Sequence, residues 1–535
     1  MQIPAKKIFI YNLPYLLMLS FFGFLSWMAL DWVDIDLLKS KSLDEYVFHN
    51  VLLNMNEGFK NFDLRQLFSF YFYLYGFPFF LLNYLVTFPF LESGSKAAIF
   101  LPRMVSVISM LMTWVYLNKI LSLRNFSKNI KYLVLLLYIL MPGVWLNATW
   151  FHPDFLMTWM MAVSIYFLLQ SNFNFNKHYY ISLIFWSVAI SIKFQALMLG
   201  PIFCWFFLNH IFSKLSYFEL IRRLIISIII VSVSYFLLNP YLIHPDGMSA
   251  WIDTFLSEFL KSSSTDIDFL SKLQNTFLLY YSSILLLSLT LIISIYFVVR
   301  DIFNLKFTFD GGISFSYLFN LYLLLMLSEK YWHHYYLPLI LFLLLLISSQ
   351  LNFFFKFFKI KKLGQFIILL LILSTQFFSF KDRLLIEVNS RINNDLLKDN
   401  PNGTQTIISK EKELEKLERL TKIIERTVEP NSKIISSAYI NLPLQRLGIK
   451  QSNNVLIYGE LSNNHLIELK DSISNVNFII VNRASGLVNT NNRDSLETSL
   501  FSNTIFESKL RKYFNVEILA YHDDLTIFKL EKNIH

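Results

Sequence analysis

The chain has 535 residues, of which 55% are hydrophobic and 16% are charged, and its formal net charge is +9. About a quarter of a typical soluble domain is charged, so this composition excludes a string of soluble globular domains. A single cysteine excludes intrachain disulfides and cysteine-rich metal or iron–sulfur sites, and the absence of P-loop and Rossmann glycine motifs argues against ATP-driven pumps and dinucleotide enzymes.

Apolar runs of about 17–25 residues, each long enough to cross a bilayer, recur along the first 380 residues. We predict a polytopic α-helical membrane protein with about eleven spans. The predicted spans are roughly residues 10–30, 97–118, 131–147, 154–170, 179–192, 196–212, 222–240, 273–299, 312–328, 335–350 and 364–380.

One further apolar run, 68–90, is predicted to lie at the membrane interface, because it carries several tyrosines and two prolines. Without it, every short basic loop falls on one side of the membrane, which the positive-inside rule makes the cytoplasm. The N-terminus then lies inside and the C-terminal region outside. The alternative is twelve spans with 68–90 crossing, and that topology breaks the charge rule.

The chain changes character near residue 385. Residues 391–535 hold 19 Lys/Arg and 18 Asp/Glu, far more densely than the first 390 residues. We therefore predict a membrane domain over 1–385 and an extracytoplasmic soluble α/β domain over 386–535. Its predicted elements are a charged helix at 409–428 and strands at 433–438, 476–482, 516–521 and 525–530, the last two forming a hairpin.

Acidic residues and histidines concentrate in the predicted outer segments, whereas the inner loops are basic. Carboxylates and imidazoles perform acid–base chemistry or bind metals, so the outer face is predicted to be the functional one. The first outer segment, 31–96, contains an amphipathic helical pattern that begins near Asp44 and Glu45, just after Ser42. A carboxylate there is favoured by the helix dipole, and the alternative is that Asp44 only caps the helix.

The Asp-Glu pair after the first span resembles the first-loop motif of the GT-C glycosyltransferases. The resemblance is closest to protein O-mannosyltransferases and lipid A aminoarabinose transferases, which are families 39 and 83. Further stretches are similar to family motifs in the same order over about residues 10–380, with Pro78 as a single proline where two are usual. These stretches are residues 73–90, 97–121, 137–169, 187–201, 237–245 and 329–343.

The resemblance implies a sugar donor linked to polyprenyl phosphate and an acceptor that approaches from outside. The acceptor would be a protein, lipid A or a cell-envelope glycan. Asp44 matches the catalytic aspartate of the family and would be the general base, with inversion at the sugar carbon. Glu45 would position the acceptor or a metal.

Contacts to the donor phosphate and sugar are expected from basic, histidine and acidic side chains near the outer face. The alternative for the basic residues is snorkelling to lipid headgroups, and Asp154 after Pro153 is also a good helix start. The candidates are Lys193, Arg103, His334, His333, Asp154 and His152.

A divalent cation, Mg²⁺ or Mn²⁺, is a further expectation, with Asp44, Glu45 and Asp154 as candidate ligands and no spacing that fixes the site. Membrane lipids are expected partners and nucleic acid is not. The amino-acid usage indicates a bacterial inner membrane. The competing interpretations are a multispanning transporter, another lipid-linked glycan enzyme such as an O-antigen polymerase or ligase, and a structural or sensory protein.

Overall fold

A computed structural model describes most of the chain. The described residues are 5–68, 75–91, 93–212, 216–260, 284–327, 333–393, 395–399, 405–428, 433–437, 442, 446–447, 454–457, 477–482, 511–512, 514–522 and 525–532.

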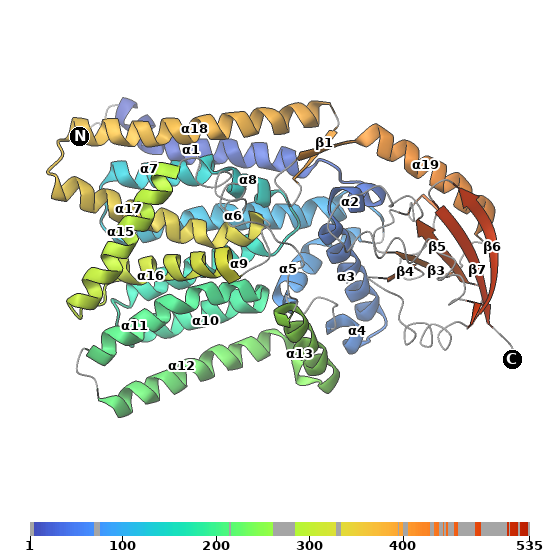
Figure 1. Cartoon of the computed structure of the whole chain (residues 1–535), viewed down its shortest axis with the longest axis horizontal. Coiled ribbons are helices and arrows are strands. Elements are labelled where there is room, and N and C mark those ends of the chain that lie inside the picture. The colour runs from blue at the N-terminus through green and yellow to red at the C-terminus, as the bar shows by residue number, and fades with distance from the viewer. Residues whose placement is uncertain are drawn as a thin grey trace.

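Long helices run side by side and form a bundle (Figure 1). They arise from the apolar runs, because a helix satisfies its backbone N–H and C=O groups internally, as a bilayer requires. The bundle helices are α1 (Ala5–Ala29), α6 (Ala97–Leu123), α7 (Lys128–Leu140), α8 (Pro142–Ala148), α9 (Asp154–Gln170), α10 (Lys177–Ile192), α11 (Gly200–Phe212), α12 (Tyr217–Leu238), α15 (Ile284–Phe303), α16 (Phe309–Tyr322), α17 (Leu337–Phe357) and α18 (Lys362–Ile392).

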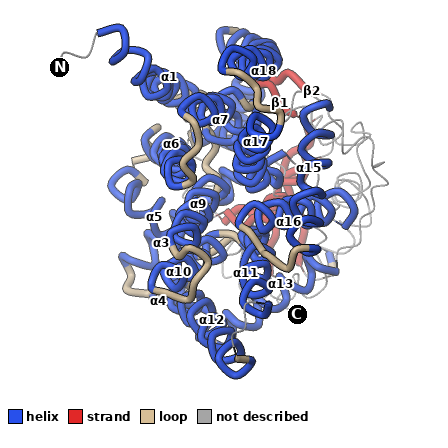
Figure 2. Tube along the Cα trace, turned by 90° about the vertical axis from the view of Figure 1, so that its left-hand side faces the viewer, coloured by secondary structure: helices blue, strands red, loops and turns tan. Residues whose placement is uncertain are grey.

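Helices α17 and α12 occupy opposite environments in the bundle. The apolar window of α17 is 78% buried, whereas that of α12 is 6% buried, and α12 lies at the edge of the bundle in the end-on view of Figure 2. The exposed side chains of α12 are mostly isoleucine, leucine and phenylalanine. Such an apolar outer surface is suited to contact with lipid.

Five described helices are long and apolar enough to cross a membrane, and α7 with α8, bent by 56°, would form a sixth. The expectation of eleven spans also counted shorter helices such as α9, which has 17 residues. At about 1.5 Å per residue, 17 residues reach about 26 Å, less than the roughly 30 Å of a hydrocarbon core. Part of the expected span 273–299 lies outside the described residues. The number of spans therefore stays a prediction.

The described residues of the run 68–90, which are 68 and 75–90, include the short helix α5 (Phe77–Thr87), followed by the 3₁₀ turn η1 (Phe88–Phe90). Its 11 residues extend about 17 Å, which is too short to cross alone. Residues 69–74 lie outside the described residues, so the interfacial interpretation of the run stays a prediction.

Short helices gather at one end of the bundle, between it and the β-sheet (Figure 1). We call this the sheet end and the opposite one the far end. The short helices are α2 (Ile35–Lys41), α3 (Leu43–Lys60), α4 (Leu64–Phe68), α5 and α13 (Pro245–Leu260), and the short turns that accompany the longer helices are η2 (Phe194–Leu199), η3 (Pro240–Ile243), η4 (Leu323–Leu327) and η5 (His333–Tyr336).

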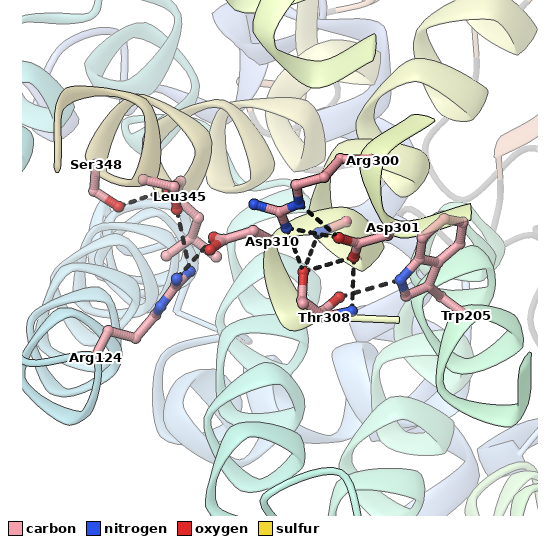
Figure 3. A network of polar contacts seen from close by, with 10 residues as sticks. Arg124, Trp205, Arg300, Asp301, Thr308, Asp310, Leu345 and Ser348 are labelled. Carbon is pink, nitrogen blue, oxygen red and sulfur yellow. Dashed lines mark hydrogen bonds and ion pairs between the residues drawn. The ribbon is translucent and has the colours of Figure 1, made fainter. Parts of the chain in front are cut away.

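A polar network ties helices together at the far end (Figure 3). Asp301 accepts hydrogen bonds from the backbone N–H of Thr308 (2.7 Å) and from its hydroxyl (2.6 Å), and it pairs with Arg300 at 2.6 Å. Thr308 caps α16, and its carbonyl accepts from Trp205 of α11 (3.1 Å). The network thus joins α11, α15 and α16.

The same network reaches two more helices through Arg124, which follows α6. Its guanidinium pairs with Asp310 of α16 at 2.7 Å and donates to Ser349 of α17 at 3.1 Å. Both carboxylates of the network are therefore paired with an arginine.

The described part of the C-terminal region contains two sheets and the helix α19. The larger sheet has the order β4-β3-β5-β7-β6, with β3 parallel to β4 and β5, and β7 antiparallel to β5 and β6. The elements are β1 (Asp395–Asp399), β2 (Gln405–Ser409), α19 (Lys410–Thr427), β3 (Lys433–Ser437), β4 (Asn454–Ile457), β5 (Asn477–Asn482), β6 (Phe514–His522) and β7 (Leu525–Lys532).

The helix expected at 409–428 is α19, and the four expected strands correspond to β3, β5, β6 and β7. The expected hairpin is the antiparallel pair β6–β7, in which His522 lies opposite Leu525. The predicted domain boundary at residue 385 falls inside α18, so this helix carries the chain from the bundle to the sheets without a break.

Candidate active site

Helix α3 begins with the Asp-Glu pair, and Ser42 is its N-cap. The Ser42 hydroxyl accepts a hydrogen bond from the backbone N–H of Glu45 (3.3 Å), as a capping serine does. Asp44 is therefore not the cap. Its side chain is 51% exposed and lies in the first turn, where the helix dipole favours a negative charge.

Glu45 faces the opposite way, into the protein. It is 1% exposed and forms a two-pronged ion pair with Arg103 of α6, at 2.9 Å and 2.8 Å. It also accepts from the backbone N–H of Phe151 (2.8 Å). One carboxylate thus fixes the start of α3 both to α6 and to the chain that leads into α9.

Burial alone would raise the pKa of Glu45, but the charges of Arg103 and Lys41 and the hydrogen bonds to Arg103 and Phe151 lower it to about 2. Glu45 is therefore an ionised anchor, engaged on both oxygens. These contacts are those of an anchor for α3, and the expected role of Glu45 toward an acceptor or a metal stays a prediction.

Arg103 is fully buried, and all its donors are used. A guanidinium has five N–H groups, and those of Arg103 donate to both oxygens of Glu45 and to the carbonyls of Ala29, Asp31 and Trp32. A donor phosphate could bind only by displacing these bonds. The contacts of Arg103 are those of a positioning residue for α3, and its expected contact with the phosphate stays a prediction.

The other predicted side chains converge at the sheet end. Asp154 Oδ1 lies 2.6 Å from Lys193 Nζ, and Asp154 Oδ2 contacts His152 Nδ1. The rings of His152 and His334 are 4.8 Å apart between centroids. His152 Nε2 lies 3.8 Å from Asp44 Oδ2. We call these five residues the outer cluster.

Three helix ends place the outer cluster. Asp154 is the first residue of α9 and follows Pro153, Lys193 ends α10 in an extended conformation (φ −157°, ψ 131°), and His334 lies in η5. Apart from Asp44, the members are at most 6% exposed. Because all these ends lie at one end of the bundle, groups distant in sequence meet in space.

Aromatic rings surround the buried part of the cluster. The Lys193 ammonium lies 5.5 Å from the ring centroid of Tyr75 and 4.8 Å from that of Tyr335, distances typical of cation–π contacts. His152 packs edge-on against Tyr75 and in a tilted arrangement against Phe48. The rings exclude water from the ion pair and strengthen its electrostatics.

The segment that carries Tyr75 is paired with the end of α10. Tyr75 and Lys193 form an antiparallel bridge, and Gly76 N donates to the carbonyl of Ile192 (3.0 Å). The next amide, that of Phe77, donates to Asn239 Oδ1 (3.0 Å). A bridge between segments over 100 residues apart has no local signal in the sequence, so these residues could not be assigned a role from it. Gly76, in a chain with only 14 glycines, is the one local sign of a close backbone approach.

The structure does not bring every candidate into the cluster. The side chain of His333 lies outside the described residues. Arg103 and Glu45 lie beside the cluster but face each other.

With its imidazoles neutral, the outer cluster has a formal charge of −1, because the carboxylates of Asp44 and Asp154 outnumber the ammonium of Lys193. Ligand atoms of His152, Asp154 and His334 all lie within 4.8 Å of one another, close enough to share one cation. Two imidazoles and a carboxylate suit zinc or manganese, whereas magnesium prefers oxygen ligands. Of the three ligands expected from sequence, only Asp154 belongs to this group, and Glu45 is held by Arg103.

Comparison with known proteins gives likeness in structure only. No family model matches the sequence, and no curated protein matches it. Among solved structures, ArnT from Cupriavidus metallidurans bound to undecaprenyl phosphate is similar with a TM-score of 0.55 and 10% identity, over 97% of this chain and 98% of that one. ArnT in the apo state gives a TM-score of 0.50 and 11% identity, over 90% and 93%.

A second similar protein is the oligosaccharyltransferase from Archaeoglobus fulgidus in the apo form. Its TM-score is 0.51 at 11% identity, over 94% of this chain and 73% of that one. Both neighbours are GT-C membrane glycosyltransferases. Nearly the whole chain therefore has the GT-C fold, as the resemblance in its motifs predicted.

Proposed function

We propose that the protein is a glycosyltransferase that moves a sugar from a polyprenyl-phosphate donor to an acceptor at the extracytoplasmic face of the membrane. The observation that carries this proposal is the outer cluster: a half-exposed carboxylate beside buried imidazoles and an ammonium, at the end of a GT-C fold. ArnT, a protein of the same fold, binds undecaprenyl phosphate, which supports a polyprenyl-linked donor.

Asp44 is the proposed general base. The acceptor oxygen or nitrogen forms a bond to the sugar anomeric carbon while the bond from that carbon to the donor phosphate breaks, and the acceptor proton passes to the Asp44 carboxylate. Polyprenyl phosphate leaves, and the configuration at the carbon inverts. The exposure of Asp44 allows direct contact with an acceptor, which a general base needs.

Lys193 and His334 are the proposed donors to the leaving phosphate. An ammonium and an imidazole placed where charge develops stabilise it in the transition state. Asp154 holds Lys193 at 2.6 Å and so sets its position. His152 lies between Asp154 and Asp44, where it can orient both carboxylates.

A divalent cation is part of the proposal, with His152, Asp154 and His334 as its ligands. When the cation is bound, His334 would serve as its ligand, and Lys193 would remain the donor to the phosphate. A bound cation would neutralise negative charge on the donor phosphate. We expect dialysis against EDTA to lower turnover, and added Mn²⁺ or Zn²⁺ to restore it more fully than Mg²⁺. The variant His334→Gln should weaken Mn²⁺ binding measured by titration calorimetry, and unchanged binding in this variant would contradict the ligand set.

Donor turnover tests the proposed function. Purified protein is incubated with a panel of polyprenyl-phosphate sugars and acceptor membranes, and release of polyprenyl phosphate is measured. We expect Asp44→Asn to lower kcat by about 10²–10⁴-fold. The control is Asp63→Asn, an exposed residue of the same outer segment, which should keep wild-type turnover. The proposal would be refuted if folded wild-type protein released no polyprenyl phosphate from any donor of the panel.

A further inference from the structure

Ser42 joins helix α2 to helix α3, which carries Asp44. Its backbone N–H donates to the carbonyl of Leu38 (2.8 Å) at the end of α2, and its hydroxyl accepts from Glu45 N at the start of α3. This residue alone separates the two helices. Because one residue caps both, a displacement of α2 is transmitted to the first turn of α3.

The C-terminal region packs directly on α2. A small buried apolar cluster is formed by Leu417 of α19 with Leu37 of α2 and with Trp32, which precedes α2. Beside it, the hydroxyl of Ser40 donates to Glu413 Oε2 at 2.7 Å. Residues more than 370 positions apart in sequence are thus in contact one turn before Asp44.

Charged contacts surround the same helix. Arg446 N donates to Asp36 Oδ2 (3.3 Å), and the guanidinium lies 3.6 Å from Asp36 and 3.8 Å from Asp34, the N-cap of α2. At the end of α18, Arg391 lies 3.3 Å from Asp31. The C-terminal region and the end of α18 therefore hold residues 31–41 at three places.

Trp32 is held in a strained conformation at this contact. Its φ is +52°, a region that bulky residues rarely adopt and that persists only where the surroundings impose it. Here the ring packs on Leu417, and the carbonyl accepts from Arg103 (3.4 Å). One of these contacts comes from the C-terminal region and the other from the bundle, so the conformation depends on both.

We propose that docking of the C-terminal region on α2 positions Asp44 for catalysis. The inference rests on the proposed function, because the step it governs is proton removal by Asp44. Leu417 and Glu413 act through α2 and touch no group of the outer cluster in the described structure, so they are positioning residues. Without the docking, α2 shifts, and the 3.8 Å approach of Asp44 to His152 is lost.

Kinetics of the full-length protein test this proposal. We expect Leu417→Ala to lower kcat by about 10-fold or more, since small misplacements at a reacting centre have large effects, and to leave KM for the donor nearly unchanged. The control Leu420→Ala removes a buried leucine of the same helix, which packs with Ile434 of β3 and Ile527 of β7 and not with α2. The milder double variant Glu413→Gln/Arg446→Gln should lower kcat in the same direction without removing buried volume.

The Asp44→Asn background separates positioning from a general loss of folded protein. If Leu417 acts through Asp44, Leu417→Ala causes no further loss of kcat once Asp44 is replaced. An equal loss in both backgrounds, or a wild-type kcat in Leu417→Ala, would overturn the proposal.

Hydrogen exchange gives a readout that does not depend on activity. Backbone amides of residues 42–46 should exchange faster in Leu417→Ala than in Leu420→Ala, measured on folded protein. Unchanged exchange would refute the positioning role even if no donor were turned over. Conversely, faster exchange with no turnover would refute only the proposed function.

Discussion

The two ends of the helix bundle each hold a partly buried polar network, and the networks differ in how their charges are paired. At the far end, Asp301 and Asp310 are each paired with an arginine, and Thr308 completes the hydrogen bonds (Figure 3). At the sheet end, the outer cluster has two carboxylates for one ammonium, and Asp44 is half exposed.

This difference in pairing favours a structural role for the far-end network and a chemical role for the outer cluster. Buried charges are stable when each is paired, and in the far-end network each carboxylate has an arginine partner. This network joins five helices. The outer cluster keeps excess negative charge and imidazoles that can accept protons or a cation. An enzyme needs such groups where substrate arrives, whereas a helix clamp needs none.

Arg103→Lys should have the largest effect of the substitutions that sharpen this comparison. Lysine keeps the charge but loses the planar fork, so Glu45, the start of α3 and the loop at Trp32 lose shared hydrogen bonds. We expect a fall in unfolding free energy on the order of 2–4 kcal/mol and a lower kcat. Thermal unfolding and donor turnover measure the two effects.

The matched control is Arg222→Lys, because Arg222 makes an exposed ion pair with Glu219. Exposed pairs contribute about 0–1 kcal/mol, so this variant should behave as wild type. Equal effects of the two substitutions would contradict the anchoring role of Arg103.

Gly76→Ala should have the next largest effect. A Cβ at Gly76 would lie 1.4 Å from the carbonyl oxygen of Ser191, so the bridge between Tyr75 and Lys193 must open. We expect turnover to fall by about 10-fold or more, because Lys193 loses its fixed position. Gly200→Ala is the control, since its Cβ would meet Trp186 at an ordinary 3.5 Å. A comparable loss of turnover in Gly200→Ala would contradict the role of the bridge between Tyr75 and Lys193.

Much of the outer cluster could be predicted from sequence, because Asp44, His152, Asp154, Lys193 and His334 all lie at ends of apolar runs on one predicted side. The structure brings these five together, and their catalytic roles stay predictions. Helix ends on one side of a bundle must share one layer, so topology alone places them near each other.

The part that sequence could not supply concerns partners distant in the chain. Arg103 was expected at the phosphate because a basic residue at a helix end looks alike whether it faces a ligand or a buried carboxylate. The bridge of Tyr75 to Lys193 and the packing of Leu417 on Trp32 could not be predicted, because in each case the partner is distant in the chain. Local periodicity predicts elements, and only the folded chain shows which side chains meet.

Lys41→Met should have the smallest effect, and the size of this effect depends on pH. Burial, together with the charge of Arg103, lowers the pKa of Lys41 from 10.5 to about 7. Between these values the unfolded chain binds more protons than the folded one, so the free energy of unfolding rises with pH across that window. The cost of charged Lys41 is therefore full below about pH 7.

Methionine removes this cost, so Lys41→Met should raise Tm at pH 6–7, and the gain should shrink toward pH 10. The control is the exposed residue Lys60, whose substitution by methionine should change Tm little. A gain in Tm for Lys41→Met that grows with pH would contradict the lowered pKa of Lys41.

The central claim is tested most directly by comparing Asp44→Asn with Asp301→Asn, one carboxylate from each network, in the same assay. Polyprenyl phosphate release is measured per folded molecule, with the folded fraction determined by thermal unfolding. We predict that Asp44→Asn keeps its Tm and loses turnover by about 10²–10⁴-fold, whereas Asp301→Asn lowers Tm and keeps turnover per folded molecule. The reverse pattern, or full turnover by Asp44→Asn, would contradict the assignment of catalysis to the outer cluster.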